Sequence, residues 1–342
     1  MTISLALVMG DPAGIGPELA VRLLAEKNLT RRARILVIGD ERLLRQAAQA
    51  NGVDLELQTV RERQAARPGE AGPILYDTAN ADPQAIAPGH ACAEGGRSVL
   101  ENLTMALDLA RDGVVEAITF VPFNKQALRM AGNSFEDELG FITDYLGHEA
   151  PCAEFNVVDD IWNARVTSHV PLRAVADLIT EERILARLDL TVRALREAGI
   201  ETPRIAVAAL NPHAGDGGAF GREDIDIVEP AVAKARARGL AVEGPFPSDT
   251  VYLRARAGEA DAVLSMYHDQ GQIAIKLIGF DRGVTVLAGL PVPVTTPAHG
   301  TAYDIVGKGT ANLEPTRRAF AIACRMAESR RAASGEKPDR RG

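Results

Sequence analysis

Short apolar segments alternate with amphipathic segments along almost the whole chain, and this alternation restricts the possible folds more than any other feature. Leu5–Met9 is followed by the amphipathic stretch Glu18–Glu26, and Ile35–Gly39 is followed by Arg42–Ala50. Short apolar runs bounded by turn residues are typical of buried strands, and a 3.6-residue period is typical of helices. The alternation therefore predicts an α/β fold, with a largely parallel sheet covered by helices.

Later segments continue this pattern, with one exception. Apolar residues recur at helical spacing in Ser98–Arg111 and Glu181–Glu197, which predicts two long helices. In Ala153–Val170, two strand-like runs flank Asp159 and Asp160, so an antiparallel hairpin inserted in the α/β array is expected there. Further strands are expected at Ala117–Val121, Arg204–Leu210, Ala262–Tyr267 and Val284–Ala288.

Length and composition limit the possible functions. The chain has 342 residues, and a single core stops growing at roughly 250–300 residues, so two domains are expected. A net charge of −8 argues against nucleic-acid binding, which needs a basic face. The apolar start Ile3–Met9 lacks a basic leader and is interpreted as a strand, not as a signal peptide. Three scattered cysteines, and no apolar run of roughly 18 residues, predict a cytoplasmic protein without membrane contact.

Three of the six histidines, His169, His213 and His268, stand at the carboxyl ends of expected strands. Ligands of open α/β sheets bind beyond these strand ends, so the three imidazoles could converge on a metal ion. Three histidines without a thiolate are typical of an open catalytic site. Asp269 and Asp216 are close enough in sequence to orient two of the imidazoles. Taken singly, each histidine could also be an ordinary loop residue.

The segment Gly10–Glu18 joins the first expected strand to the first expected helix. Its glycines allow close backbone approach, and the helix N-terminus offers free N–H groups to an anion. The spacing is not G-x-G-x-x-G, and no acidic residue clearly marks a ribose position, so the Rossmann fingerprint is absent. A purely structural glycine turn explains the segment equally well.

Four segments resemble, in order, the signature segments of the 4-hydroxythreonine-4-phosphate dehydrogenase family of pyridoxal phosphate biosynthesis: Gly10–Glu18, Asn211–Gly215, Tyr267–Gly271 and His299–Ala302. The resemblance covers nearly the whole chain. It implies a two-domain α/β/α fold like that of isocitrate and isopropylmalate dehydrogenases, with a cleft between the domains. We expect one domain from residues 1–125 with 277–330, a second domain carrying dimer contacts from 126–276, and a disordered tail at 331–342.

The resemblance also implies the chemistry: oxidation of a secondary alcohol of a hydroxy acid by NAD or NADP, followed by decarboxylation. It implies a zinc, magnesium or cobalt ion in each active site, held by His169, His213 and His268 from both subunits of an obligate homodimer. We expect the cofactor to contact the glycine loop and the last signature segment, through Gly10, Asp11, Gly14, Gly16 and His299.

Three further residues are candidates for roles in catalysis or substrate binding. Lys125 follows an expected strand and could relay a proton or bind substrate. Asp249 is a candidate for contact with the metal or the substrate hydroxyl. Lys276 matches a substrate-binding lysine of the family. Each of the three could instead be a surface residue.

The chain departs from the family pattern where substrate is bound. In an ungapped match, Glu138 and Leu139 replace a His–Thr pair, Thr285 replaces an Asn and Val294 replaces an Arg. Relatives acting on cis-dihydrodiol carboxylates, such as terephthalate dihydrodiol dehydrogenase, also lack the His–Thr pair. Such a substrate is therefore an alternative, and weak activity on the phosphate ester is expected. Otherwise Phe135–Gly147 is a helix whose acidic residues simply cap its first turn.

Two other classes of function are considered: a non-redox metal-dependent lyase or hydrolase, and a ligand-binding module with a degenerate site. The intact histidine trio, Lys125 and Asp249 argue against the module. Stabilisation by NAD or NADP would distinguish the dehydrogenase from the lyase or hydrolase, because a ligand of the native state raises the melting temperature.

Overall fold

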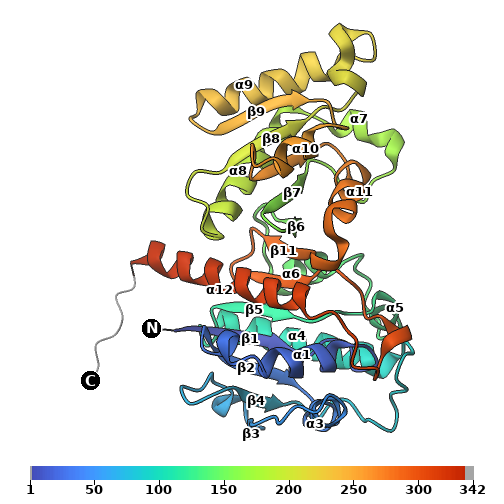
Figure 1. The fold of residues 1–342 in the computed structure, drawn as a ribbon, viewed down its shortest axis with the longest axis vertical. Helices are drawn as coiled ribbons and strands as arrows, with labels where there is room; N and C mark the ends of the chain where they lie inside the picture. The colour runs from blue at the N-terminus through green and yellow to red at the C-terminus, as the bar shows by residue number, and fades with distance from the viewer. Residues whose placement is uncertain (1, 336–342) are drawn as a thin grey trace. The chain divides into compact units, whose positions relative to one another are not determined.

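The computed structural model describes residues 2–335, and it confirms the predicted α/β class. The chain separates into two compact units (Figure 1). Unit 1 combines the residues up to Glu149 with those from Leu290 onward, and unit 2 is Ala150–Gly289.

The described part of unit 1 contains six strands in the order β3-β4-β2-β1-β5-β12, and each neighbouring pair is parallel. Its strands are β1 (Ile3–Val8), β2 (Ala33–Gly39), β3 (Gln58–Val60), β4 (Ile74–Asp77), β5 (Ala117–Phe120) and β12 (Val294–Pro297). Its α-helices are α1 (Gly16–Leu24), α2 (Lys27–Thr30), α3 (Glu41–Ala50), α4 (Ala93–Arg111), α5 (Lys125–Met130), α6 (Glu138–Leu146) and α12 (Glu314–Ser334), with short helical turns η1 (Arg63–Ala65) and η6 (Tyr303–Ile305).

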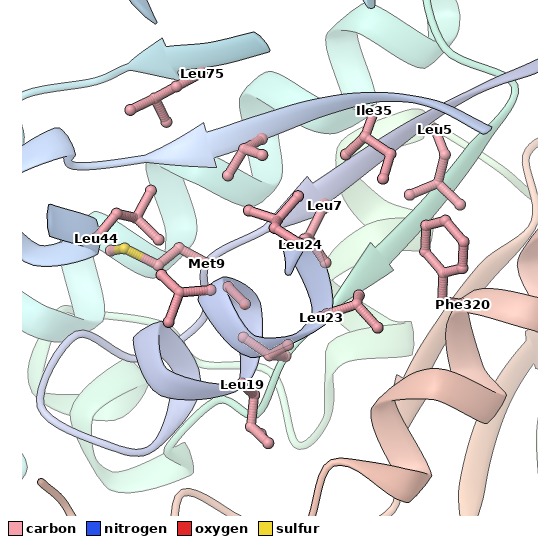
Figure 2. Close-up of a cluster of buried hydrophobic side chains, with 14 of the residues drawn as sticks. Leu5, Leu7, Met9, Leu19, Leu23, Leu24, Ile35, Leu44, Leu75 and Phe320 are labelled. Atoms are coloured by element: carbon pink, nitrogen blue, oxygen red, sulfur yellow. The ribbon is translucent and has the colours of Figure 1, made fainter. Parts of the chain in front are cut away.

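The core of unit 1 explains why β1 is apolar at every position except Ser4. All of its residues are buried, as expected for a parallel strand covered on both faces. Alternate side chains, including Leu5 and Leu7, pack against Leu19 and Leu23 of α1 and Phe320 of α12 (Figure 2). Burial of each such side chain stabilises the fold by roughly 1.5–3 kcal/mol.

Unit 2 contains six strands in the order β11-β6-β7-β10-β8-β9. The strands are β6 (Ala153–Val158), β7 (Ile161–Arg165), β8 (Arg204–Ala208), β9 (Ala241–Phe246), β10 (Ala262–Ser265) and β11 (Val284–Ala288). The helices are α7 (Val175–Leu178), α8 (Glu181–Glu197), α9 (Glu229–Ala237), α10 (Val251–Arg256) and α11 (His268–Gly279), with the short turns η2 (Leu172–Ala174), η3 (Pro212–Gly218), η4 (Asp224–Val228) and η5 (Phe280–Arg282).

The predicted hairpin is confirmed, because β6 and β7 pair antiparallel and Val158 faces Ile161 across the turn. Asp159 and Asp160 form that turn, and Asp159 adopts a φ of 51°, a left-handed conformation that aspartate tolerates better than most residues. β6 also pairs antiparallel with β11, whereas β7 pairs parallel with β10. The hairpin thus reverses the strand direction inside unit 2.

The boundaries between the two units differ from the domain boundaries expected from the sequence. Residues 126–149 fall in unit 1, because α5 and α6 pack on α4, where Tyr145 Oη donates to Asp108 Oδ1 at 2.9 Å. Residues 277–289 fall in unit 2, because β11 pairs with β6. At the C-terminus, α12 continues to Ser334, so the first residues of the expected disordered tail are helical, and residues 336–342 lie outside the described residues.

Within residues 2–335, no helix combines the length and the apolar character needed to cross a membrane.

Candidate active site

Two of the three predicted metal ligands lie together in unit 2. His169 follows β7, His268 begins α11, and their ring centroids are 5.5 Å apart. Both line one hollow with a volume of about 390 Å³. Its other lining residues are Ser168, Val170, Leu172, Val175, Tyr267 and Asp269.

A tight turn between β10 and α11 positions His268. Gln270 Oε1 accepts a hydrogen bond from Met266 N at 2.7 Å, which closes the turn. Asp269 Oδ1 lies 2.7 Å from His268 Nδ1, so Nδ1 acts as the donor and Nε2 is left to bind a ligand. Carboxylates orient metal-binding imidazoles in this way. The donor chemistry of the pair therefore fits a divalent metal ion.

His213 does not join this pair. It lies in η3 after β8, where His213 and Asp216 have left-handed φ values of 55° and 43°. Buried Asp224 holds the start of this loop by accepting the N–H groups of Leu210 and Asn211 at 2.7 and 2.9 Å. Such backbone conformations cost roughly 1–3 kcal/mol each and cluster at functional sites. No group of three His, Cys, Asp or Glu side chains within residues 2–335 could hold a metal ion, so one chain does not assemble the trio.

Asp249 and Lys276 are both exposed in unit 2, outside the lining of the histidine hollow. Asp249 lines a different hollow of about 680 Å³, together with Tyr252 and Leu277. Lys276 lies two helical turns after His268 on α11, with Nζ 5.8 Å from the centroid of the Phe280 ring. Neither residue is placed against the histidine pair within the chain.

In unit 1, the glycine loop is packed against other segments of the same unit. Gly10 has a φ of 77°, and a Cβ there would lie 2.6 Å from Val121 O. A Cβ on Gly14 would lie 2.8 Å from Thr301 Cβ, and α1 begins at Gly16. Internal packing therefore requires the first two glycines, so their presence does not by itself indicate a ligand.

Asp11 ties the glycine loop to the last signature segment. Its side chain is fully buried, and it accepts hydrogen bonds from Ala13 N at 2.9 Å and Tyr303 Oη at 2.6 Å. Burial raises the pKa of the Asp11 carboxyl, and these two hydrogen bonds offset the rise only in part. Both oxygens of Asp11 are thus used inside unit 1.

His299 lies four residues before Tyr303 and is partly buried. Its Nδ1 lies 3.0 Å from Gly300 O, whereas its Nε2 is buried and finds no hydrogen-bond partner among the described residues. Burial lowers the pKa of His299 and thus favours the neutral ring. A buried ring nitrogen without a partner is an atom that a bound cofactor could satisfy.

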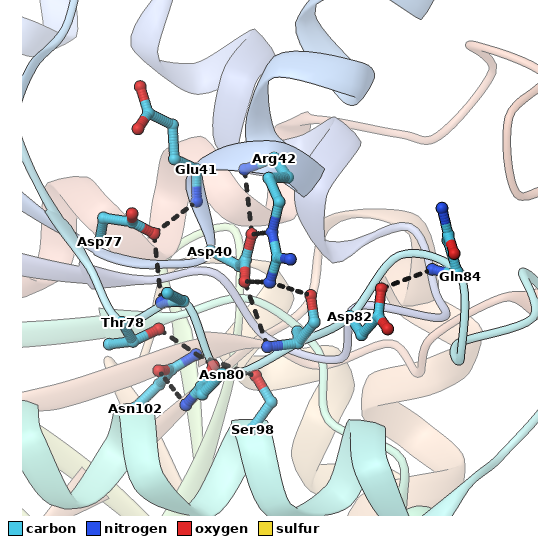
Figure 3. A network of polar contacts seen from close by, with 12 residues as sticks. Asp40, Glu41, Arg42, Asp77, Thr78, Asn80, Asp82, Gln84, Ser98 and Asn102 are labelled. Atoms are coloured by element: carbon cyan, nitrogen blue, oxygen red, sulfur yellow. Dashed lines mark hydrogen bonds and ion pairs between the residues drawn. The ribbon is translucent and has the colours of Figure 1, made fainter.

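The acidic residue at the end of β2 is not available for a ribose. Asp40 accepts hydrogen bonds from Arg42 Nη2 at 2.8 Å and from Ala81 N at 3.1 Å (Figure 3). Burial opposes ionisation of Asp40, but these hydrogen bonds outweigh it and lower the pKa of the carboxyl. Asp77 at the end of β4 is similarly engaged, by Glu41 N and by Arg61. The network anchors the ends of β2 and β4.

Lys125 and Glu138 line the same small hollow in unit 1, together with Arg129. Lys125 begins α5, and Glu138 begins α6. Asp137 is the N-cap of α6 and accepts from Gly140 N at 2.8 Å, so the predicted capping role is confirmed for this residue. Leu139 is half-buried in the first turn of α6.

The remaining two substrate candidates are buried. Thr285 lies on β11 in unit 2 and is only 9% exposed, and its hydroxyl accepts from Asn156 Nδ2 at 3.3 Å. Val294 lies on β12 in unit 1 and is 0% exposed. Its side chain packs inside the unit, so a direct contact between Val294 and substrate has no support in the structure.

The chain was compared with family models, with curated proteins and with solved structures. The model of the family described as "Pyridoxal phosphate biosynthetic protein PdxA" matches residues 31–323. The chain belongs to the PdxA family. It is 52% identical to a protein of Rhizobium meliloti (strain 1021) named "Putative 4-hydroxythreonine-4-phosphate dehydrogenase 2", over 96% of this chain and 95% of that protein.

Two further PdxA relatives extend the comparison. The D-threonate 4-phosphate dehydrogenase of Salmonella typhimurium (strain LT2) is 38% identical over 95% of this chain and 99% of the relative. The crystal structure of 4-hydroxythreonine-4-phosphate dehydrogenase from Klebsiella pneumoniae is 38% identical, with a TM-score of 0.81, and the match covers 96% of this chain and 98% of that one. The predicted family is therefore confirmed.

Membership of the PdxA family makes the chain an NAD(P)-dependent oxidoreductase that acts on a CH–OH group. The family also implies a divalent metal ion in general terms. The predicted enzyme class is confirmed, and the ligand-binding module and the non-redox lyase or hydrolase are both disfavoured.

Proposed function

We propose that this chain is a metal-dependent, NAD(P)-linked dehydrogenase that oxidises the secondary alcohol of a phosphorylated hydroxy acid and then decarboxylates the product. The pair of imidazoles over the hollow in unit 2, in a chain of a dehydrogenase family, carries the proposal. The relatives' names supply two substrates, 4-hydroxythreonine 4-phosphate and D-threonate 4-phosphate. In this reaction a hydride passes to NAD(P)⁺ and the hydroxyl releases its proton. The β-keto acid then loses its carboxylate as CO₂, and the α-carbon takes up a proton in its place. We place the enzyme in the cytoplasm, in keeping with its three free cysteines.

A phosphorylated substrate replaces our sequence-based preference for one without phosphate. That preference depended on Glu138 repelling a phosphate and on the loss of an Arg at Val294. Glu138, however, shares its hollow with the cations Lys125 and Arg129, which offset its charge. Val294 is buried inside unit 1. A cis-dihydrodiol carboxylate remains the alternative substrate.

His169 and His268 would hold the metal ion, with Asp269 fixing the tautomer of His268. A divalent ion, zinc, magnesium or cobalt, would supply Lewis-acid polarisation of the substrate oxygen. Lys276 would bind an anionic group of the substrate, and Thr285 would lie beneath the same site. Lys125 would relay a proton or bind substrate, and Asp249 would contact the metal ion or the hydroxyl.

The nicotinamide cofactor would bind in unit 1 at the Gly10–Gly16 loop and His299. Two observations support this cofactor site. His299 Nε2 is buried and has no hydrogen-bond partner among the described residues. Two residues further along, Thr301 O accepts the N–H of Ile15 in the glycine loop at 3.0 Å. The roles of Gly10, Asp11, Gly14 and Gly16 would be to shape this loop. Asp11 does so through its hydrogen bond with Tyr303.

A second copy of the chain would complete the site by delivering His213, and Asp249 would reach it in the same way. Exposed apolar side chains support this assembly. Leu253, Ile273, Leu277 and Phe280 are 51–83% exposed on and beside α10 and α11. Phe220, beside His213, is 52% exposed. Large exposed apolar side chains of this kind are typical of protein interfaces.

A substrate panel tests the function. Both phosphorylated acids and a cis-dihydrodiol carboxylate are supplied with NAD or NADP and a divalent metal, and nicotinamide reduction and CO₂ release are measured. We expect reduction with at least one phosphorylated acid, and an increase in melting temperature with the preferred cofactor. Reduction with the dihydrodiol alone would overturn the phosphorylated substrate. Turnover without nicotinamide reduction would identify a lyase or hydrolase instead.

A further inference from the structure

A cluster of polar side chains joins β6, β7 and β11 to the loop that carries His169 and to α11, which begins with His268. We call it the Asn156 network, and it consists of Glu154, Asn156, Arg165, Ser168, Gln272 and Thr285. Asn156 on β6 is 5% exposed, and Arg165 on β7 is 3% exposed. Polar groups this deeply buried are costly unless they are hydrogen-bonded, so their partners reveal what the network holds in place.

Asn156 is the centre of the network and uses both ends of its amide. Its Oδ1 accepts from Arg165 Nη1 at 2.8 Å and from Gln272 Nε2 at 2.5 Å. Its Nδ2 donates to Thr285 Oγ1 at 3.3 Å and to Glu154 Oε1 at 3.2 Å. An asparagine amide offers two acceptor and two donor positions, and all four are filled here. The side chain is therefore fixed in one orientation.

Arg165 connects this centre to the loop that carries His169. Its Nε donates to Ser168 Oγ at 3.0 Å, and Ser168 immediately precedes His169. Its Nη2 donates to Glu154 O at 3.3 Å, and Glu154 Oε1 lies 3.7 Å away. The guanidinium is planar and offers its donors in a fixed fork, so it sets the position of Ser168 more rigidly than a lysine would. His169 itself has a left-handed φ of 48° and needs such support.

Gln272 connects the same centre to the helix that carries His268. It lies one helical turn after His268 and one turn before Lys276, so the three residues share one face of α11. Its bond to Asn156 ties that face to β6. Through Thr285, the network also reaches β11. The Asn156 amide thus links the loop that carries His169, the face of α11 with His268 and Lys276, and Thr285 on β11.

We propose that Asn156 and Arg165 are positioning residues that hold His169, the His268–Lys276 face of α11, and Thr285 in one fixed arrangement. Neither residue needs to touch the metal ion or the substrate. Arg165 fixes the loop that carries His169, which is the metal side of the site. Asn156 links Arg165 to Thr285 and to the α11 face with Lys276, which form the substrate side. This inference rests on the proposed function, because it assumes that His169 and His268 bind a metal ion. Residues that orient metal-binding histidines change metal affinity by roughly 10–100-fold when they are replaced.

Cobalt binding separates these roles from simple structural support. Purified full-length protein is titrated with Co²⁺, and affinity is measured together with the visible absorption band of the bound ion, which depends on ligand geometry. Wild type, Arg165→Met, Arg165→Lys and Ser168→Ala are compared. Thr191→Val is the matched control, because Thr191 is fully buried in unit 2 and its hydroxyl donates within α8, to Arg187 O at 2.7 Å, and not to a residue of the Asn156 network.

We expect Arg165→Met to weaken Co²⁺ binding at least about 10-fold and to alter the absorption band. Arg165→Lys should recover part of the loss, and Thr191→Val should bind Co²⁺ like wild type. If Arg165→Met does not fold, Ser168→Ala carries the test, because it removes only the contact next to His169. A folded Arg165→Met or Ser168→Ala with wild-type affinity and band overturns the inference alone. A wild type that binds no Co²⁺ overturns the proposed metal site, and the inference with it.

Asn156→Asp tests the substrate side. The carboxylate can still accept from Arg165 and Gln272, but both donations of the amide, to Thr285 Oγ1 and to Glu154 Oε1, are lost. We expect its Co²⁺ affinity to stay within about 3-fold of wild type, well below the 10–100-fold losses seen when orienting groups are removed, while KM for the substrate rises. An unchanged KM with unchanged kcat would show that the link to Thr285 has no role in positioning substrate.

Discussion

Single residues determine how the proposed metal site behaves, and Asp269 is the clearest case. Its carboxylate lies 2.7 Å from His268 Nδ1 and fixes which ring nitrogen faces a ligand. We expect Asp269→Asn to weaken divalent metal binding roughly 10–100-fold, as measured by calorimetric titration. Asp189→Asn, which makes the same change on α8, should bind like wild type. Equal affinities for the two variants would show that Asp269 does not orient His268.

His299 gives a pH prediction with a defined sign. Burial lowers the pKa of His299 from 6.5. Below pH 6.5 the unfolded chain takes up a proton that the folded chain resists, so unfolding becomes easier. The destabilisation is absent above pH 6.5, grows as the pH falls, and levels off below the folded-state pKa. We expect urea unfolding to show a smaller loss of stability on acidification for His299→Gln than for wild type. Parallel pH profiles would contradict this.

The sequence predicted some residues of the candidate site and missed others for physical reasons. His169, His213 and His268 stood out because each follows an apolar strand. Asn156 and Arg165 did not, because a polar residue inside a strand has the same pattern whether it faces solvent or a buried network. The burial that gives Arg165 its role arises because β7 pairs with β10, and β6 pairs with β11, although the strands of each pair are distant in sequence.

At the level of elements, the sequence predicted α8 and β11 with their observed bounds, because strong periodicity and glycine or charged residues mark their ends. Other strands were predicted to be too long, because they were extended into the loops that follow them. β10 ends at Ser265, not at Tyr267, because Gln270 bonds back to Met266 and turns the chain into α11. A bond between a side chain and a backbone group of this kind leaves no periodic signal.

The start of α6 gives an element-scale prediction about substrate. Glu138 shares a hollow with Lys125 and Arg129, so its negative charge lowers the attraction of that hollow for a phosphate. We expect Glu138→Gln to raise kcat/KM for the phosphorylated acid up to about 10-fold, or about 1.4 kcal/mol, with a smaller gain at high salt. Asp144→Asn neutralises an exposed charge on the same helix and should change nothing. Equal effects of both variants would place Glu138 away from the substrate.

At the level of the whole molecule, length alone predicted two parts, and the structure has two compact units. The positions of their boundaries could not be predicted from periodicity. Residues 126–149 look like any helical pair in the sequence, and only the packing of α5 and α6 on α4 assigns them to unit 1. Likewise, β11 belongs to unit 2 through its pairing with β6.

The composite site gives the last prediction. If each site takes His169 and His268 from one chain and His213 from a second, His169→Ala and His213→Ala should each be inactive as pure proteins. When the two are unfolded, mixed in equal amounts and refolded, half of the dimers should be hybrids with one intact site each. Activity should then reach about a quarter of wild type, as expected for random pairing in a twofold dimer.

The matched control is the mixture of His169→Ala with His268→Ala, whose lost ligands come from the same chain. No hybrid of these two variants contains an intact site, so the mixture should stay inactive. The difference between the two mixtures excludes simple stabilisation by a partner as the cause of any recovery. Recovery in both mixtures would contradict the pairing of His169 with His268 in one chain. Recovery in neither, with dimers shown by their mass, would mean that His213 serves its own chain or does not bind the metal ion.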